Sequence, residues 1–237
     1  MKHAKLRLFS FAALSNSISS VNFDQFYSRS VAEQNSFDLS WNLLMDERFD
    51  DLRNAIFATS EEMARFRSLV VNGVMATDIV DKDLKALRNA RWEKAFSTQT
   101  ANAPESPRSS EDARADVNRK ATIVIEHLIQ ASDVAHTMQH WHVYRKWNEN
   151  LFMEMYAAFK AGRLAKNPVE FWYEGEKGFF DFYIIPLAKK LKDCGVFGVS
   201  SDEYLTYAER NRAEWEIKGE EVVAELVEKI NREDREA

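Results

Sequence analysis

The sequence contains few of the residues that β-rich, disulfide-stabilised or membrane-spanning proteins require. Its 237 residues include only seven glycines and four prolines, and an all-β fold needs more of both for its turns, so helix is favoured. The single cysteine, Cys194, allows no internal disulfide, which fits a reducing compartment and favours a cytoplasmic location. No run of about 18 apolar residues occurs, so we expect no membrane-spanning segment.

Charge and apolar content narrow the class of protein further. The formal net charge of -6 argues against a nucleic-acid partner, because a phosphate-binding surface needs surplus Lys and Arg. Hydrophobic residues make up 45% of the chain, which is ordinary for a globular protein. A chain of this length can bury one core, or form one domain with tails.

Residues 1–26 differ in pattern from the rest of the chain. Lys2, Lys5 and Arg7 precede a short apolar stretch and several serines, and no acidic residue occurs before Asp24. This pattern is similar to a weak secretory or transit peptide. The alternatives are a first amphipathic helix, or a start produced by truncation of a longer gene. A targeting segment is therefore the alternative to cytoplasmic placement.

Apolar residues at helical spacing, together with capping signals, predict an all-α fold. Thr59 and Glu62 form a capping box at one helix start. Asn167-Pro168 marks another start, and Gly162 and Gly195 mark two helix ends. The expected helices cover residues 30–45, 59–75, 83–96, 117–138, 142–159 and 168–191, with a final helix opened by Ser200 and Glu203.

Two charged segments are expected to contribute little to the core. Residues 97–116, STQTANAPESPRSSEDARAD, combine Ser, Ala, Pro and charge, which predicts a disordered loop. Residues 216–237 are predicted to form a charged C-terminal helix or tail whose end is solvated.

One predicted helix carries a candidate metal site. Asp133, His136 and His140 are spaced i, i+3 and i+7, so they share one helical face. Carboxylate and imidazole ligands at this spacing can hold a single transition-metal ion. The alternative is that Asp133 caps a helix or forms a salt bridge, while the histidines, with nearby His142, are ordinary surface residues. The spacing of Trp141, Tyr144 and Trp147 by itself indicates core packing.

Five segments in order along residues 27–215 resemble the catalytic domain of class I 3',5'-cyclic-nucleotide phosphodiesterases. That resemblance implies a compact multi-helix domain of the HD superfamily. Each motif alone is weak, and their shared order makes the resemblance specific. The segments are Tyr27 with Ser30-Val31-Ala32-Glu33 for Y-x-x-x-S-V-x-E, Val74 to Asp78 for L-A-T-D, Gln130 to Val134 for H-C-A-D-L, Tyr144-Arg145-x-Trp147 for Y-R-x-W, and Glu176 to Asp181 for Q-x-G-F-I-D.

The resemblance implies metal-dependent hydrolysis of cyclic AMP or cyclic GMP to the 5'-monophosphate in signal transduction. Asp133 matches the family's metal-ligating aspartate. Glu33 and Asp78 match acids that hold metal-bound water and tune its acidity. The expected ions are Zn and Mg, which lower the pKa of bound water and stabilise the attacking and leaving oxygens.

The resemblance also implies a set of nucleotide-binding residues. Phe179 matches the aromatic residue that stacks on the purine, with Trp147 and Phe180 packing that wall, and His136 replaces a nucleotide-contacting asparagine. Glu176 replaces the glutamine that reads the purine edge. An ionised glutamate only accepts hydrogen bonds, so our hypothesis is that Glu176 favours guanine, with its N1–H, unless burial protonates the carboxyl. The alternative is that Glu176 lies at the rim of the site and reads nothing.

The main departure from the family lies before Tyr27. The family draws two metal-binding histidines, an aspartate and a general-acid histidine from that region, but here it contains only His3, and no His-Asp pair occurs in the chain. We therefore expect an N-terminally truncated domain that lacks most metal ligands. It would be a truncated product, a remnant, or a half that needs an upstream domain or a second copy. The alternative function is a non-catalytic helical module that binds a nucleotide or a protein.

We expect negligible hydrolysis of cyclic nucleotides by the isolated chain, because one carboxylate cannot assemble a binuclear metal site. The measurement is turnover by purified protein at its own expected mass, with and without added divalent ions. Metal-dependent turnover clearly above the protein-free background contradicts this expectation.

Overall fold

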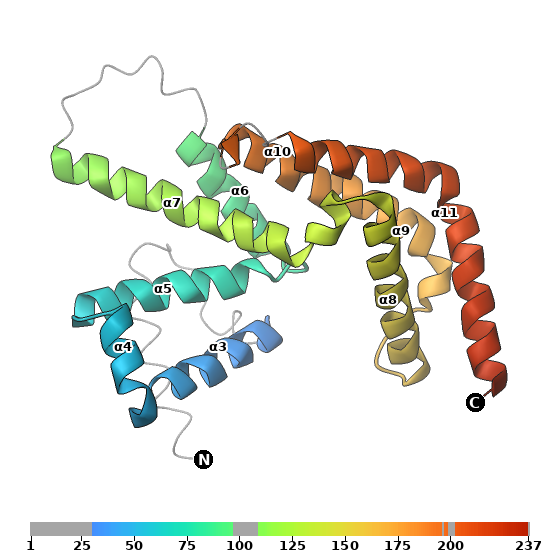
Figure 1. The fold of residues 1–237 in the computed structure, drawn as a ribbon, viewed down its shortest axis with the longest axis horizontal. Coiled ribbons are helices and arrows are strands. Elements are labelled where there is room, and N and C mark those ends of the chain that lie inside the picture. Colours follow the sequence, from blue (N-terminus) through green and yellow to red (C-terminus); the bar gives the residue numbers. More distant parts are fainter. Residues whose placement is uncertain (1–29, 97–108, 196, 199–201, 237) are drawn as a thin grey trace. The chain divides into compact units, whose positions relative to one another are not determined.

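Every regular element in the part of the chain that the structure describes is a helix, which confirms the all-α prediction. The structure is a computed structural model, shown as a ribbon in Figure 1. The described residues are 30–96, 109–195, 197–198 and 202–236.

The chain divides into two compact units, residues 1–129 and 130–237. The N-terminal segment 1–26, Tyr27 and the capping residue Ser200 fall outside the described residues. Within the described ranges, no helix combines the length and the apolar character needed to cross a membrane.

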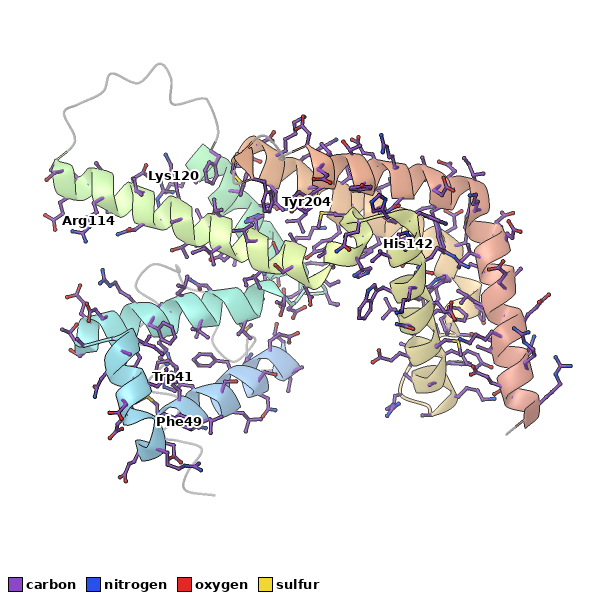
Figure 2. The ribbon with its side chains drawn as sticks, viewed as in Figure 1. Trp41, Phe49, Arg114, Lys120, His142 and Tyr204 are labelled. Carbon is purple, nitrogen blue, oxygen red and sulfur yellow. The ribbon has the colours of Figure 1, made fainter. Side chains whose placement is uncertain are left out.

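The first unit begins with helices that pack through aromatic rings. The Phe37 and Trp41 rings stack with centroids 5.8 Å apart, and Trp41, which Figure 2 labels, also meets Phe66 at 6.5 Å. The Arg67 guanidinium lies over both α3 rings, a cation–π arrangement that stabilises the pair. These elements are α3 (Val31–Leu44), η1 (Glu47–Phe49), α4 (Asp50–Ile56), α5 (Ser60–Ala76) and α6 (Lys82–Phe96).

The predicted capping box of α5 is confirmed. The backbone N–H of Glu62 donates to the Thr59 hydroxyl over 3.2 Å, and the Glu62 carboxylate accepts from the backbone N–H of Thr59 over 3.1 Å. Two N–H groups that a helix start leaves without partners are satisfied in this way, which fixes where α5 begins.

Helix α7 (Ser110–Asp133) begins seven residues before the predicted start. The predicted loop 97–116 is therefore wrong over residues 110–116, and residues 97–108 lie outside the described ranges. The Ser109 hydroxyl accepts from the Asp112 N–H over 3.1 Å, and Asp116 pairs with Lys120 at 3.0 Å. A cap and an i,i+4 ion pair thus stabilise a polar first turn that lacks an apolar pattern.

The second unit has a large aromatic core. Tyr144, Phe152, Phe180 and Trp215 are fully buried, and Tyr144 meets Phe180 and Trp215 edge to face, with centroids 5.2 and 5.9 Å apart. This core joins three helices that are distant in sequence. The elements are η3 (Ala135–Met138), α8 (Trp141–Lys160), η4 (Pro168–Glu170), α9 (Trp172–Phe179), the π-helical η5 (Phe180–Ile184), α10 (Ile185–Asp193) and α11 (Glu203–Glu236).

The helix predicted from Pro168 through Leu191 is interrupted. Asn167 accepts from the Val169 N–H over 3.1 Å, as expected for a cap, but the element it opens is the short η4. A π-helical turn then separates α9 from α10. Gly195, with φ of 66°, follows the end of α10, and Gly162, with φ of 72°, follows α8, so both predicted helix ends are confirmed.

Helix α11 is packed as far as Ile230, although its charge predicts a solvated segment, and residues 231–235 are exposed. Val222, Leu226 and Ile230 are buried, because apolar residues four positions apart form a stripe among the charged ones. On both sides of this stripe α11 pairs with α8, through Arg145–Glu225 at 2.7 Å and Glu149–Lys229 at 2.6 Å. Since both partners advance together, the two helices run in the same direction, as Figure 1 shows.

Gly219→Ala is expected to lower the free energy of unfolding by about 1–3 kcal/mol, as overpacking does. The added Cβ would lie 2.9 Å from side-chain atoms of Trp215 and Tyr173. Where space around the added Cβ is free, Gly→Ala in a helix stabilises by about 1 kcal/mol. A loss of stability at Gly219 would therefore identify the close contact with Trp215 and Tyr173.

The matched control is Gly73→Ala in α5, where nothing lies within 4 Å of the added Cβ. Denaturant unfolding of both variants is the measurement, and the control is expected to gain stability. A Gly219→Ala chain as stable as wild type contradicts the close approach of α11 to Tyr173.

Candidate functional site

The segment after Asp133 leaves the helical path, which separates the three candidate metal ligands. Asp133 is the last residue of α7, His136 lies in η3, and His140 has φ of -54° and ψ of 145° at the start of α8. These residues therefore share no helical face. Among the described residues, no group of three or more His, Cys, Asp or Glu side chains is placed to hold a metal ion. The predicted mononuclear site is wrong.

His136 lies beside an exposed indole. Its ring centroid is 6.0 Å from that of Trp147, and Trp147 is 53% exposed. Burial lowers the pKa of His136, an effect that the nearby Asp133 carboxylate partly offsets. A neutral imidazole can both donate and accept a hydrogen bond. The aromatic spacing predicts that Trp147 packs in the core, and this prediction is wrong. The exposed indole instead offers a face on which a planar ring can stack.

His140 and His142 lie on the surface, away from this pair of rings. The His140 Nε2 atom is 3.0 Å from the Tyr207 hydroxyl, and the rings of the two histidines stack with centroids 5.8 Å apart. Figure 2 labels His142 near the start of α8. These contacts join α8 to α11, which is a structural role.

Glu176 is the most deeply placed acid of the second unit. Its Oε2 accepts a hydrogen bond from the Tyr144 hydroxyl over 2.7 Å. The side chain is only 8% exposed, so it does not lie at an open rim. Helix α8 supplies the donor and α9 the acceptor, and the bond therefore ties together the two helices that carry the expected nucleotide contacts.

A chain of donors sets the direction of this hydrogen bond. The Trp172 indole N–H, which can only donate, meets Asn148 Oδ1 at 3.2 Å. The Asn148 amide nitrogen must then face the Tyr144 hydroxyl, 3.4 Å away, which leaves the Tyr144 proton for Glu176. The amide also hydrogen-bonds the carboxyl directly. Glu176 is thus held as an acceptor.

Burial dominates the ionisation of this network. It raises the pKa of Glu176, although the hydrogen bonds from Tyr144 and Asn148 oppose that rise. Burial, together with the neighbouring carboxylate, raises the pKa of Tyr144 well above its ordinary value. Tyr144 therefore remains protonated and available as the donor.

The two adjacent phenylalanines differ in accessibility. Phe180 has no exposed surface and packs edge-on against Tyr144. Phe179 is half-buried and stacks on Tyr183, with centroids 5.4 Å apart and planes at 10°. Phe179 can therefore offer a ring face to a ligand. Phe180 instead packs against the Tyr144 ring and holds it in place.

Asp78 closes a turn in the first unit. Its Oδ1 accepts the N–H groups of Val80 and Asp81 over 2.9 and 3.1 Å, and its Oδ2 accepts the Ser30 hydroxyl. Burial raises the pKa of Asp78, but these hydrogen bonds outweigh burial and hold the pKa below its ordinary value. Asp78 is therefore an anion whose oxygens already serve the protein's own donors.

Ser30 connects Asp78 to the helix that carries Glu33. Ser30 has φ of 51°, and no other non-glycine residue in the described ranges has a positive φ. Its hydroxyl donates to Asp78 and does not cap α3. The start of α3, with Glu33 in its first turn, is therefore held against the end of α5.

The described residues do not fit a binuclear metal centre by themselves. Glu33 and Asp78 belong to the first unit and Asp133 to the second, and no cluster of ligands forms among the described side chains. A structural zinc needs four protein ligands, and a catalytic one needs about three. No chemical step is therefore assigned to a metal here.

Sequence reasoning missed Asn148, Trp172 and Asn211. Asn148 follows Tyr144 by four residues, so helical periodicity places both on one face, and this signal could have identified it. Trp172 and Asn211 come from other helices, and no local pattern brings them to α8 or to the segment after Asp133.

Two comparisons relate the chain to known proteins. The family described as 3'5'-cyclic nucleotide phosphodiesterase matches residues 14–196. The phosphodiesterase domain of the RhoPDE fusion protein from the choanoflagellate Salpingoeca rosetta shares 19% identity at a TM-score of 0.58, covering 86% of this chain and 60% of its own. The phosphodiesterase domain of Salpingoeca rosetta rhodopsin phosphodiesterase shares 18% identity at a TM-score of 0.57, covering 88% and 59%.

The two structural matches concern the fold, and the chain spans about 60% of the first one's length. No curated protein sequence matches the chain.

Glu176→Gln is expected to change how stability depends on pH. Because burial raises the pKa of Glu176 in the folded chain, the folded state keeps a proton that the unfolded state releases above about pH 4.3. The contribution of Glu176 to stability therefore falls as pH rises through its raised pKa. We expect the variant to gain stability relative to wild type as pH rises from the ordinary glutamate pKa of about 4.3 through the raised pKa of Glu176.

Urea unfolding of both chains at several pH values measures this difference. Glu174→Gln on the same helix is the control, because that side chain is 72% exposed. A stability difference for Glu176→Gln that stays constant with pH contradicts the raised pKa.

Proposed function

This chain belongs to the 3',5'-cyclic nucleotide phosphodiesterase family, and we propose that its second unit binds a cyclic nucleotide and prefers cyclic GMP to cyclic AMP. One observation carries the proposal. Glu176, at the position that resembles the family's purine-reading glutamine, is a buried carboxyl group that Tyr144 holds as a hydrogen-bond acceptor.

The preference for guanine follows from hydrogen-bond polarity. Guanine presents two donors on one edge, at N1 and at its exocyclic amine, whereas adenine presents an acceptor at N1. A carboxylate can accept from both guanine donors but has no proton for adenine N1. An unpaired acceptor in a buried site costs about 1–3 kcal/mol, so Glu176 penalises adenine more than it rewards guanine.

The remaining contacts are proposed from exposure and geometry. Phe179 and Trp147 each retain accessible ring surface, and Phe179 is the proposed stacking partner of the purine. His136, neutral because burial lowers its pKa, is proposed to hydrogen-bond the nucleotide. Phe180 keeps Tyr144, and through it Glu176, in place.

We propose hydrolysis of the cyclic phosphodiester in second-messenger signalling only for an assembly that supplies further metal ligands. In such an assembly Asp133 would ligate a Zn or Mg ion, while Glu33 and Asp78 would hold bound water. Another domain or a second copy of the chain would provide the missing ligands. The isolated chain is proposed to bind nucleotide with little turnover, in the cytoplasm.

A second candidate function is a non-catalytic helical module that binds a protein. It is favoured by apolar side chains on the surface of the first unit, where Leu39 and Leu43 on α3 are 62% and 55% exposed. Most of the buried core residues, by contrast, lie in the second unit. Exposed apolar area of this kind marks association sites.

Wild-type protein is expected to bind cyclic GMP about tenfold more tightly than cyclic AMP, and Glu176→Gln is expected to abolish most of that difference. Displacement of a fluorescent cyclic nucleotide by each unlabelled nucleotide measures both affinities, with Glu174→Gln as the matched control. An unchanged preference in Glu176→Gln contradicts the role of Glu176. Self-association of a chain that binds neither nucleotide supports the second candidate.

A further inference from the structure

The segment that joins α7 to α8 does not form a regular α-helix, so helical hydrogen bonds do not hold its backbone in place. This connector, residues 134–140, contains only the short η3 and an extended stretch before α8. It carries His136, which lies beside Trp147. Its backbone carbonyls at the end of η3 have no continuing helix to bond to, so they need other donors.

Asn211 of α11 supplies those donors. Its side-chain Nδ2 lies 2.9 Å from the carbonyl oxygen of Thr137 and 2.7 Å from that of Gln139. The side chain is 2% exposed. Because carbonyl oxygens only accept, both amide hydrogens of Asn211 are used, and the connector is fixed at two points.

Tyr207 adds a third point of attachment. It precedes Asn211 by one helical turn, so both side chains leave the same face of α11. Its hydroxyl is 3.0 Å from His140 Nε2, and its ring meets the His140 ring edge to face, with centroids 4.7 Å apart. One turn of α11 thus holds the C-terminal half of the connector at three points.

Helix α11 is itself fixed to the helices around the nucleotide contacts. The Trp215 indole donates to the carbonyl of Tyr173 in α9 over 3.0 Å, and Lys229 pairs with Glu149 of α8. The turn that holds the connector therefore has a defined place relative to α8, which carries Trp147, and α9, which carries Glu176.

We propose that Asn211 and Tyr207 are positioning residues for nucleotide binding: they hold the connector so that His136 stays beside Trp147. This inference rests on the proposed function, because the nucleotide contacts of His136 and Trp147 are part of that proposal. Neither positioning residue needs to touch the nucleotide. Their effect on affinity passes through the connector.

The sharpest variant is Asn211→Asp, which keeps the size of the side chain but places an anion against two carbonyl oxygens. We expect it to weaken cyclic GMP binding about five- to tenfold, because two hydrogen bonds are lost. Tyr207→Phe keeps the ring contact and removes only the hydroxyl, so a smaller loss of about two- to threefold is expected. This milder variant serves if Asn211→Asp does not fold.

The control is Lys218→Met, which removes an exposed ion pair with Glu214 within α11 and leaves its contacts with the connector, α8 and α9 in place. Nuclear magnetic resonance of the His136 ring and Trp147 indole provides a readout that needs no nucleotide. Both signals are expected to shift in Asn211→Asp and to stay in place in Lys218→Met.

A loss of thermal stability in Asn211→Asp with unchanged His136 and Trp147 signals and unchanged affinity overturns the inference, because it shows a structural role alone. If wild-type protein binds no cyclic nucleotide, the proposed function is wrong. The resonance shifts still decide in that case whether Asn211 positions His136, so the two failures are distinguishable.

Discussion

The hydrogen bond from Tyr144 to Glu176 is the interaction on which the second unit depends. It joins α8 to α9 inside the core, and it holds the buried Glu176 carboxyl as an acceptor. Phe180 and Trp215 pack edge-on around Tyr144, so the donor cannot move without disturbing the core. Trp172 and Asn148 fix its polarity. Packing and hydrogen-bond direction together make Glu176 an acceptor.

The long helix α11 organises the surface around that core. Its apolar stripe is buried along α8, and its side chains reach the connector, α9 and η5 in turn, for example through the Arg212–Asp181 ion pair at 2.8 Å. These contacts with the connector, α9 and η5 come from residues 207–215 of α11, just before the predicted charged tail 216–237, whose apolar stripe packs along α8. Among the described residues, the first unit leaves more of its large apolar side chains exposed than the second unit does.

Sequence patterns predicted the helical class, most helix boundaries and the family, because these depend on local signals such as the Thr59–Glu62 capping box and on the order of motifs. They did not predict that α7 ends at Asp133. The connector that follows is held by Asn211, about seventy residues away along the chain, and local patterns do not report such a distant contact. The burial of Val222 and its neighbours was missed since abundant charge obscured a short apolar stripe. Glu176 was found by resemblance, but its burial and its hydrogen-bond partners required the structure.

The central claim is that Glu176 contacts the base of a bound cyclic nucleotide. Carbon-13 resonance of the Glu176 carboxyl carbon, recorded while cyclic GMP is added, tests it most directly. The account predicts that this resonance moves in step with saturation by cyclic GMP and moves little with cyclic AMP. Binding of cyclic GMP that shifts other resonances while the Glu176 carboxyl stays unchanged would contradict the account.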